Sequence, residues 1–205
     1  MGVSENFHCQ VSPISRGRGR SSVAAAAYQS GTALYDERTQ QTYDYTRKRG
    51  ILASQVLLPA GLSATGTELT RVKLWNLAEK TDIRSNSCTA RDFEISIPDI
   101  LTPPQRHDLG LRLGQYLADF RRGAADVCWH DRRKDSKTNN YHLHILCTTR
   151  EVIKDEDGKM ILGGKCVQEL PSNSAARSAM RGWRGRPPAR PRLTASPPRC
   201  EKRAI

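Results

Sequence analysis

A strict alternation of polar and apolar residues from Asp92 to Ile97 is the feature that most restricts the fold of this chain. Asp92, Glu94 and Ser96 would face one way and the apolar residues between them the other, because successive side chains of a strand point to opposite faces of a sheet. Pro98 would end the strand. Such a strand has one face in a core and one polar face, which is typical of an antiparallel sheet.

Helices and further strands surround this segment. Apolar residues recur at helical spacing over 67–80 and again over 109–120. A shorter helix over 21–28 would begin at a serine and contains a run of alanines. The polar stretch 35–50 shows no helical period. Strands are expected over 7–11, 51–58, 125–129 and 141–148. The order of the elements predicts an α+β sandwich with a mainly antiparallel sheet flanked by helices.

The composition of the chain changes at about Pro171. Nine Lys or Arg stand against Glu201 alone in residues 171–205, which leaves only +4 of the net charge of +12 for residues 1–170. Proline and arginine are abundant there and no apolar periodicity remains. We therefore predict one domain over 1–170 and a disordered, basic tail over 171–205. A basic balance favours polyanions as partners but indicates neither specificity nor chemistry.

Targeting segments and cysteine motifs do not stand out in the sequence. No run of eighteen apolar residues occurs, and the first residues lack a basic region followed by an apolar segment. We therefore expect a cytoplasmic protein without membrane insertion. The six cysteines form no C-x-x-C pair, so we expect reduced cysteines rather than disulfides or a cysteine zinc site.

Three histidines are the strongest candidates for a metal site. His142 and His144 are two residues apart on an expected strand, so both imidazoles would point to the same face. The preceding strand ends at His130, and antiparallel pairing of the two strands would bring its imidazole beside them. Three imidazoles leave coordination positions of a divalent ion open, and such an ion can polarise a phosphate oxygen. Surface histidines with no metal are the alternative interpretation.

Tyr28, Asp92 and Glu94 are the other candidates for chemistry. Tyr28 follows an alanine run that would let its helix pack closely. A phenol has a pKa of about 10, so it needs a base or a metal-bound phosphate to act as a nucleophile. Asp92 and Glu94 share the polar face of their strand, which suits proton abstraction or the orientation of a metal-bound histidine. An ordinary half-buried tyrosine and a solvated strand face are the alternatives.

Three basic clusters flank these segments. Their candidate DNA-binding residues are Arg18, Arg20, Arg47, Lys48, Arg49 and Arg132. With Tyr43, Tyr45 and Trp129 interleaved, the clusters suit a channel for single-stranded DNA that offers phosphate contacts and stacking platforms. Each cluster, taken alone, could equally be a solvated loop.

Together these segments resemble the MobA/MobL family of plasmid-mobilisation relaxases, which belong to the HUH endonuclease class. The resemblance spans roughly residues 6–166 and is carried by several motifs in a specific order. These are His8-Cys9, the stretch Ser21 to Gly31 (SSVAAAAYQSG), Tyr43 to Lys48 (YDYTRK), Arg91 to Pro98 (RDFEISIP), and His130 with Asn140 to Ile145 (NYHLHI).

The resemblance implies a fold and a reaction. Relaxases of this class have a ferredoxin-like or split βαβ palm with a five-stranded antiparallel sheet. In this chain Tyr28 would attack a scissile phosphodiester at a plasmid origin of transfer, leaving a 5′-phosphotyrosyl link and a free 3′-hydroxyl. Glu94, and after it Asp92, match acidic positions that the family links to proton handling. Because one ester is exchanged for another, the same site could rejoin the strand without ATP.

The resemblance also implies a cofactor and partners. His130, His142 and His144 would hold a divalent ion, Mg²⁺ or Mn²⁺, that polarises the scissile phosphate. The implied partners are single-stranded DNA at the origin of transfer, accessory mobilisation proteins and a coupling protein.

Two departures from the family pattern leave other functions open. The loop 131–140 is longer and more basic than expected, so His130 could be held differently from the other two histidines. From Ser172 the chain resembles the product of a frameshift in GC-rich DNA, which suggests the hypothesis of a truncated copy. The alternatives are a truncated, non-catalytic DNA-binding remnant and a rolling-circle replication initiator, whose tyrosine usually follows the histidine motif. A metal hydrolase of small substrates would leave Tyr28 without a role.

Overall fold

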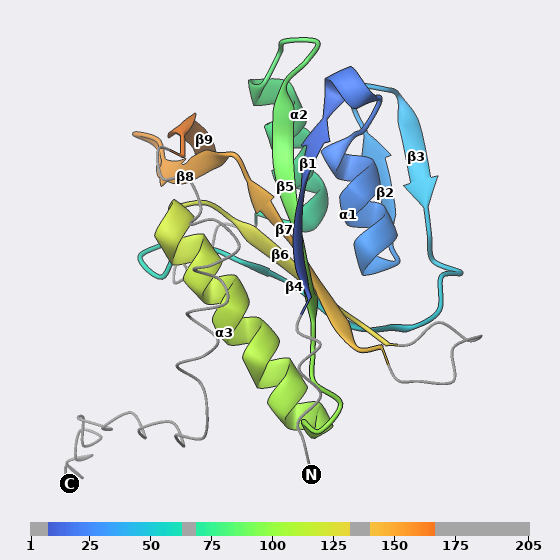
Figure 1. Ribbon diagram of the computed structural model, residues 1–205. Helices are drawn as coiled ribbons and strands as arrows, with labels where there is room; N and C mark the ends of the chain where they lie inside the picture. Colours follow the sequence, from blue (N-terminus) through green and yellow to red (C-terminus); the bar gives the residue numbers. More distant parts are fainter. Residues whose placement is uncertain (1–7, 63–68, 132–139, 167–205) are drawn as a thin grey trace, which may run out of the picture. The chain divides into compact units, whose positions relative to one another are not determined.

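A five-stranded antiparallel sheet forms the centre of the structure, a computed structural model that describes residues 8–62, 69–131 and 140–166 (Figure 1). The described residues all lie in one unit, Met1–Pro171. Strand order in the sheet is β1-β5-β7-β6-β4, and every neighbouring pair is antiparallel. The strands are β1 (Cys9–Ser15), β4 (Ile51–Leu57), β5 (Cys88–Ser96), β6 (Ala125–His130) and β7 (His142–Thr148). The expected α+β fold with a mainly antiparallel sheet is confirmed.

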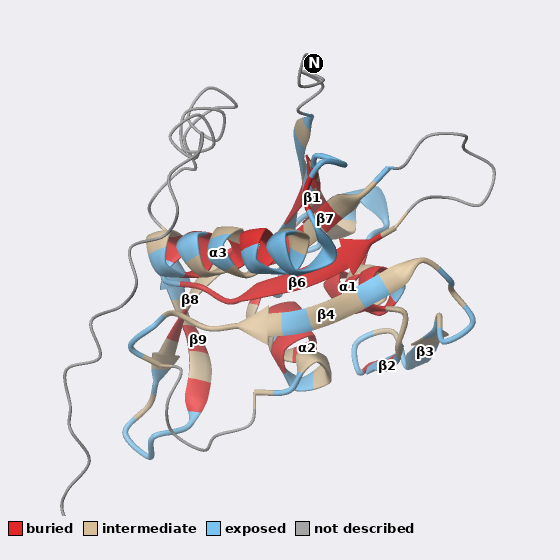
Figure 2. Cartoon of the chain, turned by 90° about the horizontal axis from the view of Figure 1, so that it is seen from below, coloured by how far each residue is buried: buried red, intermediate tan, exposed pale blue. Residues whose placement is uncertain are grey.

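Helices cover both faces of this sheet. The helices are α1 (Ser22–Ser30), α2 (Arg71–Thr81) and α3 (Pro103–Arg121). Helices α1 and α2 pack together on one face, and α3 lies along the other (Figure 2). None of the helices in the described ranges is both long and apolar enough to cross a membrane.

Two small hairpins flank the sheet and were not expected from the sequence. Strands β2 (Ala33–Asp36) and β3 (Gln41–Asp44) pair with each other, as do β8 (Arg150–Lys154) and β9 (Met160–Lys165). Strand β3 is polar apart from Tyr43 and shows no alternation of polar and apolar residues, which explains why the polar stretch 35–50 did not predict a hairpin.

The alanine run of α1 lets this helix approach its neighbours closely. Ala26 and Ala27 are fully buried with Leu74 and Trp75 of α2 in one apolar cluster. The Trp75 indole N–H donates to Asp126 Oδ2 on β6 at 3.0 Å, so the same tryptophan joins α2 to the sheet. The close packing predicted for the alanine run is confirmed.

Two glycines allow α3 to lie directly on β6. A Cβ atom at Gly110 would lie 2.3 Å from Trp129 Nε1, and one at Gly114 would lie 2.3 Å from Val127 Cγ2. Trp129 is buried, and its indole N–H donates to the Arg106 carbonyl at 3.1 Å. The expectation that Trp129 serves as a stacking platform for DNA is therefore wrong, because α3 covers the ring.

Replacing Gly110 with alanine should lower the free energy of unfolding by about 1–3 kcal/mol, the usual cost of overpacking. Alanine is the better helix former, so a loss would report on the packing alone. Urea unfolding would measure the change. Arg112→Ala, at an exposed position of the same helix, is the matched control and should change the value by less than about 0.5 kcal/mol. Equal stability of Gly110→Ala and the wild-type chain would contradict the close contact.

Candidate active site

Three imidazoles converge at one end of the sheet. His130 at the end of β6 lies directly opposite His142 at the start of β7, and His144 lies opposite Cys128 on the same face. The ring centroids are 4.9–5.3 Å apart. One ligand nitrogen of each histidine lies within 4.8 Å of the other two. The strand pairing expected from the sequence thus gathers the three rings as predicted.

Protein oxygens hold two of these rings. His144 Nδ1 lies 3.2 Å from Asp92 Oδ1, and His142 Nδ1 lies 2.9 Å from the carbonyl oxygen of Asn140. A ring nitrogen that faces such an acceptor carries the proton, so the other nitrogen keeps its lone pair for a metal ion. Contacts of this kind fix the orientation of metal-binding histidines. Asp92 is therefore in a position to orient the His144 ring.

Gln29 joins the third ring to helix α1. Its carbonyl oxygen lies 2.6 Å from His130 Nε2, and its amide nitrogen lies 3.5 Å from His144 Nδ1. The side chain is buried, and its Oε1 has no hydrogen-bond partner among the described residues. Sequence reasoning missed this residue. The available signal was its spacing of three from Ala26, which places it on the buried face of the helix that presents Tyr28.

Burial keeps two of the imidazoles uncharged. Desolvation lowers the pKa of His130 to about 4, and the positive charge of Lys48 acts in the same direction. Burial also lowers the pKa of His142 from its ordinary value. At neutral pH both rings are therefore neutral, which is the form that binds a metal ion.

Tyr28 lies in the last turn of α1 and is 45% exposed. Lys48 Nζ lies 3.4 Å from the centroid of its ring and donates to its carbonyl oxygen at 2.8 Å. The ring of Tyr45 meets it edge-on with centroids 5.2 Å apart. Arg47 and Arg49 are exposed on either side of Lys48. The solvent-exposed phenol of Tyr28 thus lies beside basic side chains, and the next residue, Gln29, contacts His130.

The two predicted carboxylates differ in their surroundings. Asp92 is buried beside His144, whereas Glu94 is exposed. Glu94 lies opposite His144 in the pairing of β5 with β7, so both residues share one face of the sheet. The structure thus places one carboxylate against an imidazole and leaves the other accessible.

The remaining basic candidates lie farther away or outside the described residues. Arg18 and Arg20 are exposed just before the first turn of α1, at the opposite end of that helix from Tyr28. Arg20 donates to the Pro13 carbonyl at 3.3 Å. Arg132 falls outside the described residues. Their role in DNA binding stays a prediction.

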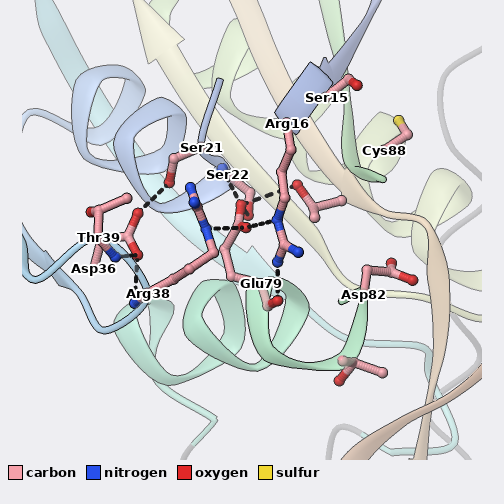
Figure 3. Close-up of polar contacts among 12 residues, drawn as sticks. Ser15, Arg16, Ser21, Ser22, Asp36, Arg38, Thr39, Glu79, Asp82 and Cys88 are labelled. Carbon is pink, nitrogen blue, oxygen red and sulfur yellow. Dashed lines mark hydrogen bonds and ion pairs between the residues drawn. The ribbon is translucent and has the colours of Figure 1, made fainter. Parts of the chain in front are cut away.

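Two buried carboxylates fix the start of α1 (Figure 3). Glu79 Oε1 accepts hydrogen bonds from the backbone N–H and the hydroxyl of Ser22, both at 2.8 Å. Ser21 caps the helix by accepting from the Ala24 N–H at 3.3 Å, and its hydroxyl donates to Asp36 Oδ2 at 2.7 Å. A carboxylate at a helix N-terminus can accept hydrogen bonds from the free N–H groups there, and its negative charge interacts favourably with the positive end of the helix dipole.

Two arginines neutralise the buried Glu79. Its Oε2 accepts from Arg16 Nε at 2.9 Å and from Arg38 Nε at 3.1 Å, and Arg16 also donates to its carbonyl oxygen. The side chain of Arg16 is only 9% exposed. Arg16, the first arginine of the cluster 16–20, is therefore paired with Glu79 inside the fold, where it helps to position α1.

The fold class is shared with a solved structure described as "Molecular Basis of Vancomycin Resistance Transfer in Staphylococcus aureus". The two superpose with a TM-score of 0.66 at 23% sequence identity, and the match covers 86% of this chain and 88% of that one. This likeness shows a common α+β architecture.

Sequence comparisons define the family. The sequence profile of the MobA/MobL family matches residues 20–186, which lie on both sides of the boundary expected near Pro171. "Mobilization protein MobL" of Acidithiobacillus ferridurans is 39% identical over 183 residues, covering 79% of this chain and 46% of that protein. "Conjugal transfer protein TraA" of Agrobacterium fabrum is 30% identical over 184 residues, covering 80% of this chain and 16% of that protein. The chain belongs to the MobA/MobL family and spans less than half the length of these two relatives.

Glu79→Gln should destabilise the chain by about 3 kcal/mol, since it leaves Arg16 without its buried counter-charge. Urea unfolding would measure the loss, and hydrogen exchange should show faster exchange of the α1 amides. Glu37→Gln, at an exposed carboxylate, is the matched control and should change neither value. Unaltered exchange in α1 of Glu79→Gln would show that this carboxylate does not anchor the helix.

Proposed function

We propose that this chain is the DNA-nicking domain of a plasmid-mobilisation relaxase, which cuts and rejoins one strand at an origin of transfer. The observation that carries the proposal is that three clustered imidazoles contact the end of the helix that exposes Tyr28. Membership of the MobA/MobL family supports it. The names of the relatives, a mobilization protein and a conjugal transfer protein, support the biological setting.

The reaction is a transesterification at phosphorus. The Tyr28 oxygen forms a bond to the scissile phosphorus as the bond to the 3′ oxygen breaks. The phenol proton passes to a base, and the departing oxygen takes up a proton and leaves as a free 3′-hydroxyl. Exposed Glu94 is the proposed proton acceptor, since buried Asp92 is occupied with His144. The number of phosphoester bonds is unchanged, so the same groups can rejoin the strand.

The residues present fit a divalent metal ion. His130, His142 and His144 each have one ring nitrogen held by a protein oxygen and the other left for coordination. A bound divalent ion would polarise a non-bridging phosphate oxygen as a Lewis acid. Because nitrogen donors bind transition ions more tightly than the harder Mg²⁺, the all-imidazole set favours Mn²⁺ over Mg²⁺.

Lys48 serves both the nucleophile and the substrate in this proposal. Its ammonium group packs over the Tyr28 ring and so helps to hold it, and the positive charge attracts a DNA phosphate. Exposed Arg47 and Arg49 extend the basic surface on either side. Single-stranded DNA at the origin of transfer is the proposed substrate. The relaxase would act in the cytoplasm with accessory mobilisation proteins and a coupling protein.

Tyr28→Phe should abolish a covalent adduct that the wild-type chain forms with DNA. The assay uses Mn²⁺ and labelled single-stranded oligonucleotides that cover the neighbouring plasmid sequence, with adducts scored on a denaturing gel. Tyr116→Phe, which alters another exposed tyrosine, is the matched control and should form the adduct as the wild-type chain does. A folded, DNA-binding wild-type chain that forms no adduct would contradict the proposal and favour a non-catalytic DNA-binding remnant.

His144→Ala should abolish Mn²⁺ binding, and Asp92→Asn should weaken it by about 10–100-fold, the usual effect of losing a residue that orients a metal ligand. Isothermal titration calorimetry would measure both affinities, and cleavage should fall in parallel. His107→Ala lies outside the cluster, on α3, and should leave Mn²⁺ binding intact. Single-stranded DNA binding should stay within a few-fold in all three variants. Loss of DNA binding together with Mn²⁺ binding in His144→Ala would instead mean that the histidine supports the fold.

A further inference from the structure

A cationic cavity of about 610 Å³ lies at the other end of the sheet from the histidines. It forms where the ends of α2 and α3 meet the start of β5 and the β8–β9 hairpin. Its charged lining residues are Arg84, Arg91, Arg121, Arg150, Lys165 and Asp82. Asp82 is the one carboxylate among the lining residues that the structure describes, so positive charge predominates.

Asp82 neutralises only two of these cations. Its Oδ1 lies 2.9 Å from Arg150 Nη2, and its Oδ2 lies 2.6 Å from Lys165 Nζ. Arg84, Arg91 and Arg121 line the same cavity, and no carboxylate of the described residues forms an ion pair with them. Three guanidinium groups therefore face one cavity with no acidic partner in the described part of the chain.

One of these three cations, Arg121, is buried. The residue is only 5% exposed, and its Nε has no hydrogen-bond partner among the described residues. Its Nη2 reaches the Thr148 carbonyl only at 3.4 Å. A buried guanidinium without an anion is unfavourable, because the loss of hydration is not offset by a counter-charge. An anion bound in the cavity would neutralise this buried cation.

We propose that this cavity binds a phosphate group of single-stranded DNA, at a distance from the phosphodiester that is cut. The inference rests on the proposed function in taking single-stranded DNA as the substrate. The planar guanidinium fork matches a phosphate and binds it through two parallel hydrogen bonds. Cys88 lines the cavity at one end of β5, and Ser96 at the other end pairs with His142. Arg91 also lines the cavity, and Glu94 pairs with His144, so at about 3.3 Å per residue the two sites are roughly 10–26 Å apart along β5, a span of more than one nucleotide.

The double variant Arg84→Gln/Arg91→Gln tests this inference, because both side chains are exposed and their loss spares the core. Fluorescence anisotropy with oligo-dT of graded length would give affinities over a series of salt concentrations. The variant should bind short oligonucleotides as the wild-type chain does and long ones more weakly. The slope of log affinity against log salt for long oligonucleotides should fall by about 1.4, which corresponds to two lost phosphate contacts.

A matched control separates a pocket from a general charge effect. Lys73→Gln/Arg112→Gln removes the same charge from exposed positions outside the cavity and should leave the length dependence unchanged. An equal loss in both double variants, or a loss in the cavity variant that does not depend on length, would overturn the proposal.

Inorganic phosphate distinguishes a free anion from DNA. Phosphate that raises the melting temperature of the wild-type chain but not of Arg84→Gln/Arg91→Gln, with DNA binding unaltered, would assign the cavity to free phosphate and overturn the DNA assignment. The Tyr28 adduct on a short oligonucleotide tests the proposed function separately. That adduct should form in the cavity variant as in the wild-type chain, so failure of the cavity proposal leaves the nicking proposal standing.

Discussion

The buried carboxylate of Glu79 holds together the part of the molecule on which the candidate site depends. It accepts hydrogen bonds from the start of α1 and ion pairs from Arg16 and Arg38, which lie far from it in sequence. A helix of nine residues is too short to be stable alone, so its position must come from such contacts and from the packing of its alanines. Because Tyr28 and Gln29 lie at the far end of this helix, its anchoring determines where the phenol lies relative to the imidazoles that Gln29 contacts.

Gln29 makes the helix and the sheet parts of one site. Its backbone carbonyl holds His130, and its side chain approaches His144, while the preceding residue exposes a phenol to solvent. The burial that surrounds these contacts also keeps His130 neutral at physiological pH. One short segment thus links the orientation of the ligands to the position of the proposed nucleophile, and both are supported by rigid elements rather than loops.

Strand β5 connects the histidine cluster, which is the proposed metal site, with the cationic cavity. Its Asp92 orients one imidazole, Glu94 stays accessible on the same face, and its first residue lines the cavity near Arg121. Because the central strands pair without interruption, the spacing between the histidines and the cavity is a property of the sheet. If the proposed function holds, a DNA strand that reached both places would contact the protein along the sheet as well as at the phosphodiester proposed to be cut.

Local patterns in the sequence, which include periodicity, apolar runs and the serine and alanines of 21–28, were sufficient to predict the α+β class, the helices and the central strands. They also predicted that His142 and His144 share a face and that His130 approaches them, since a period of two and one connecting loop leave little freedom. Tertiary structure alone decided the rest. Glu79 pairs with Arg16, 63 residues away in the sequence, and Gln29 approaches His144, 115 residues away. Trp129 lies on a strand that is buried on both faces, so no alternation of polar and apolar residues shows which face its side chain is on. Local patterns encode which face of an element is apolar. Which distant polar groups meet depends on how the elements pack, and no local pattern records that.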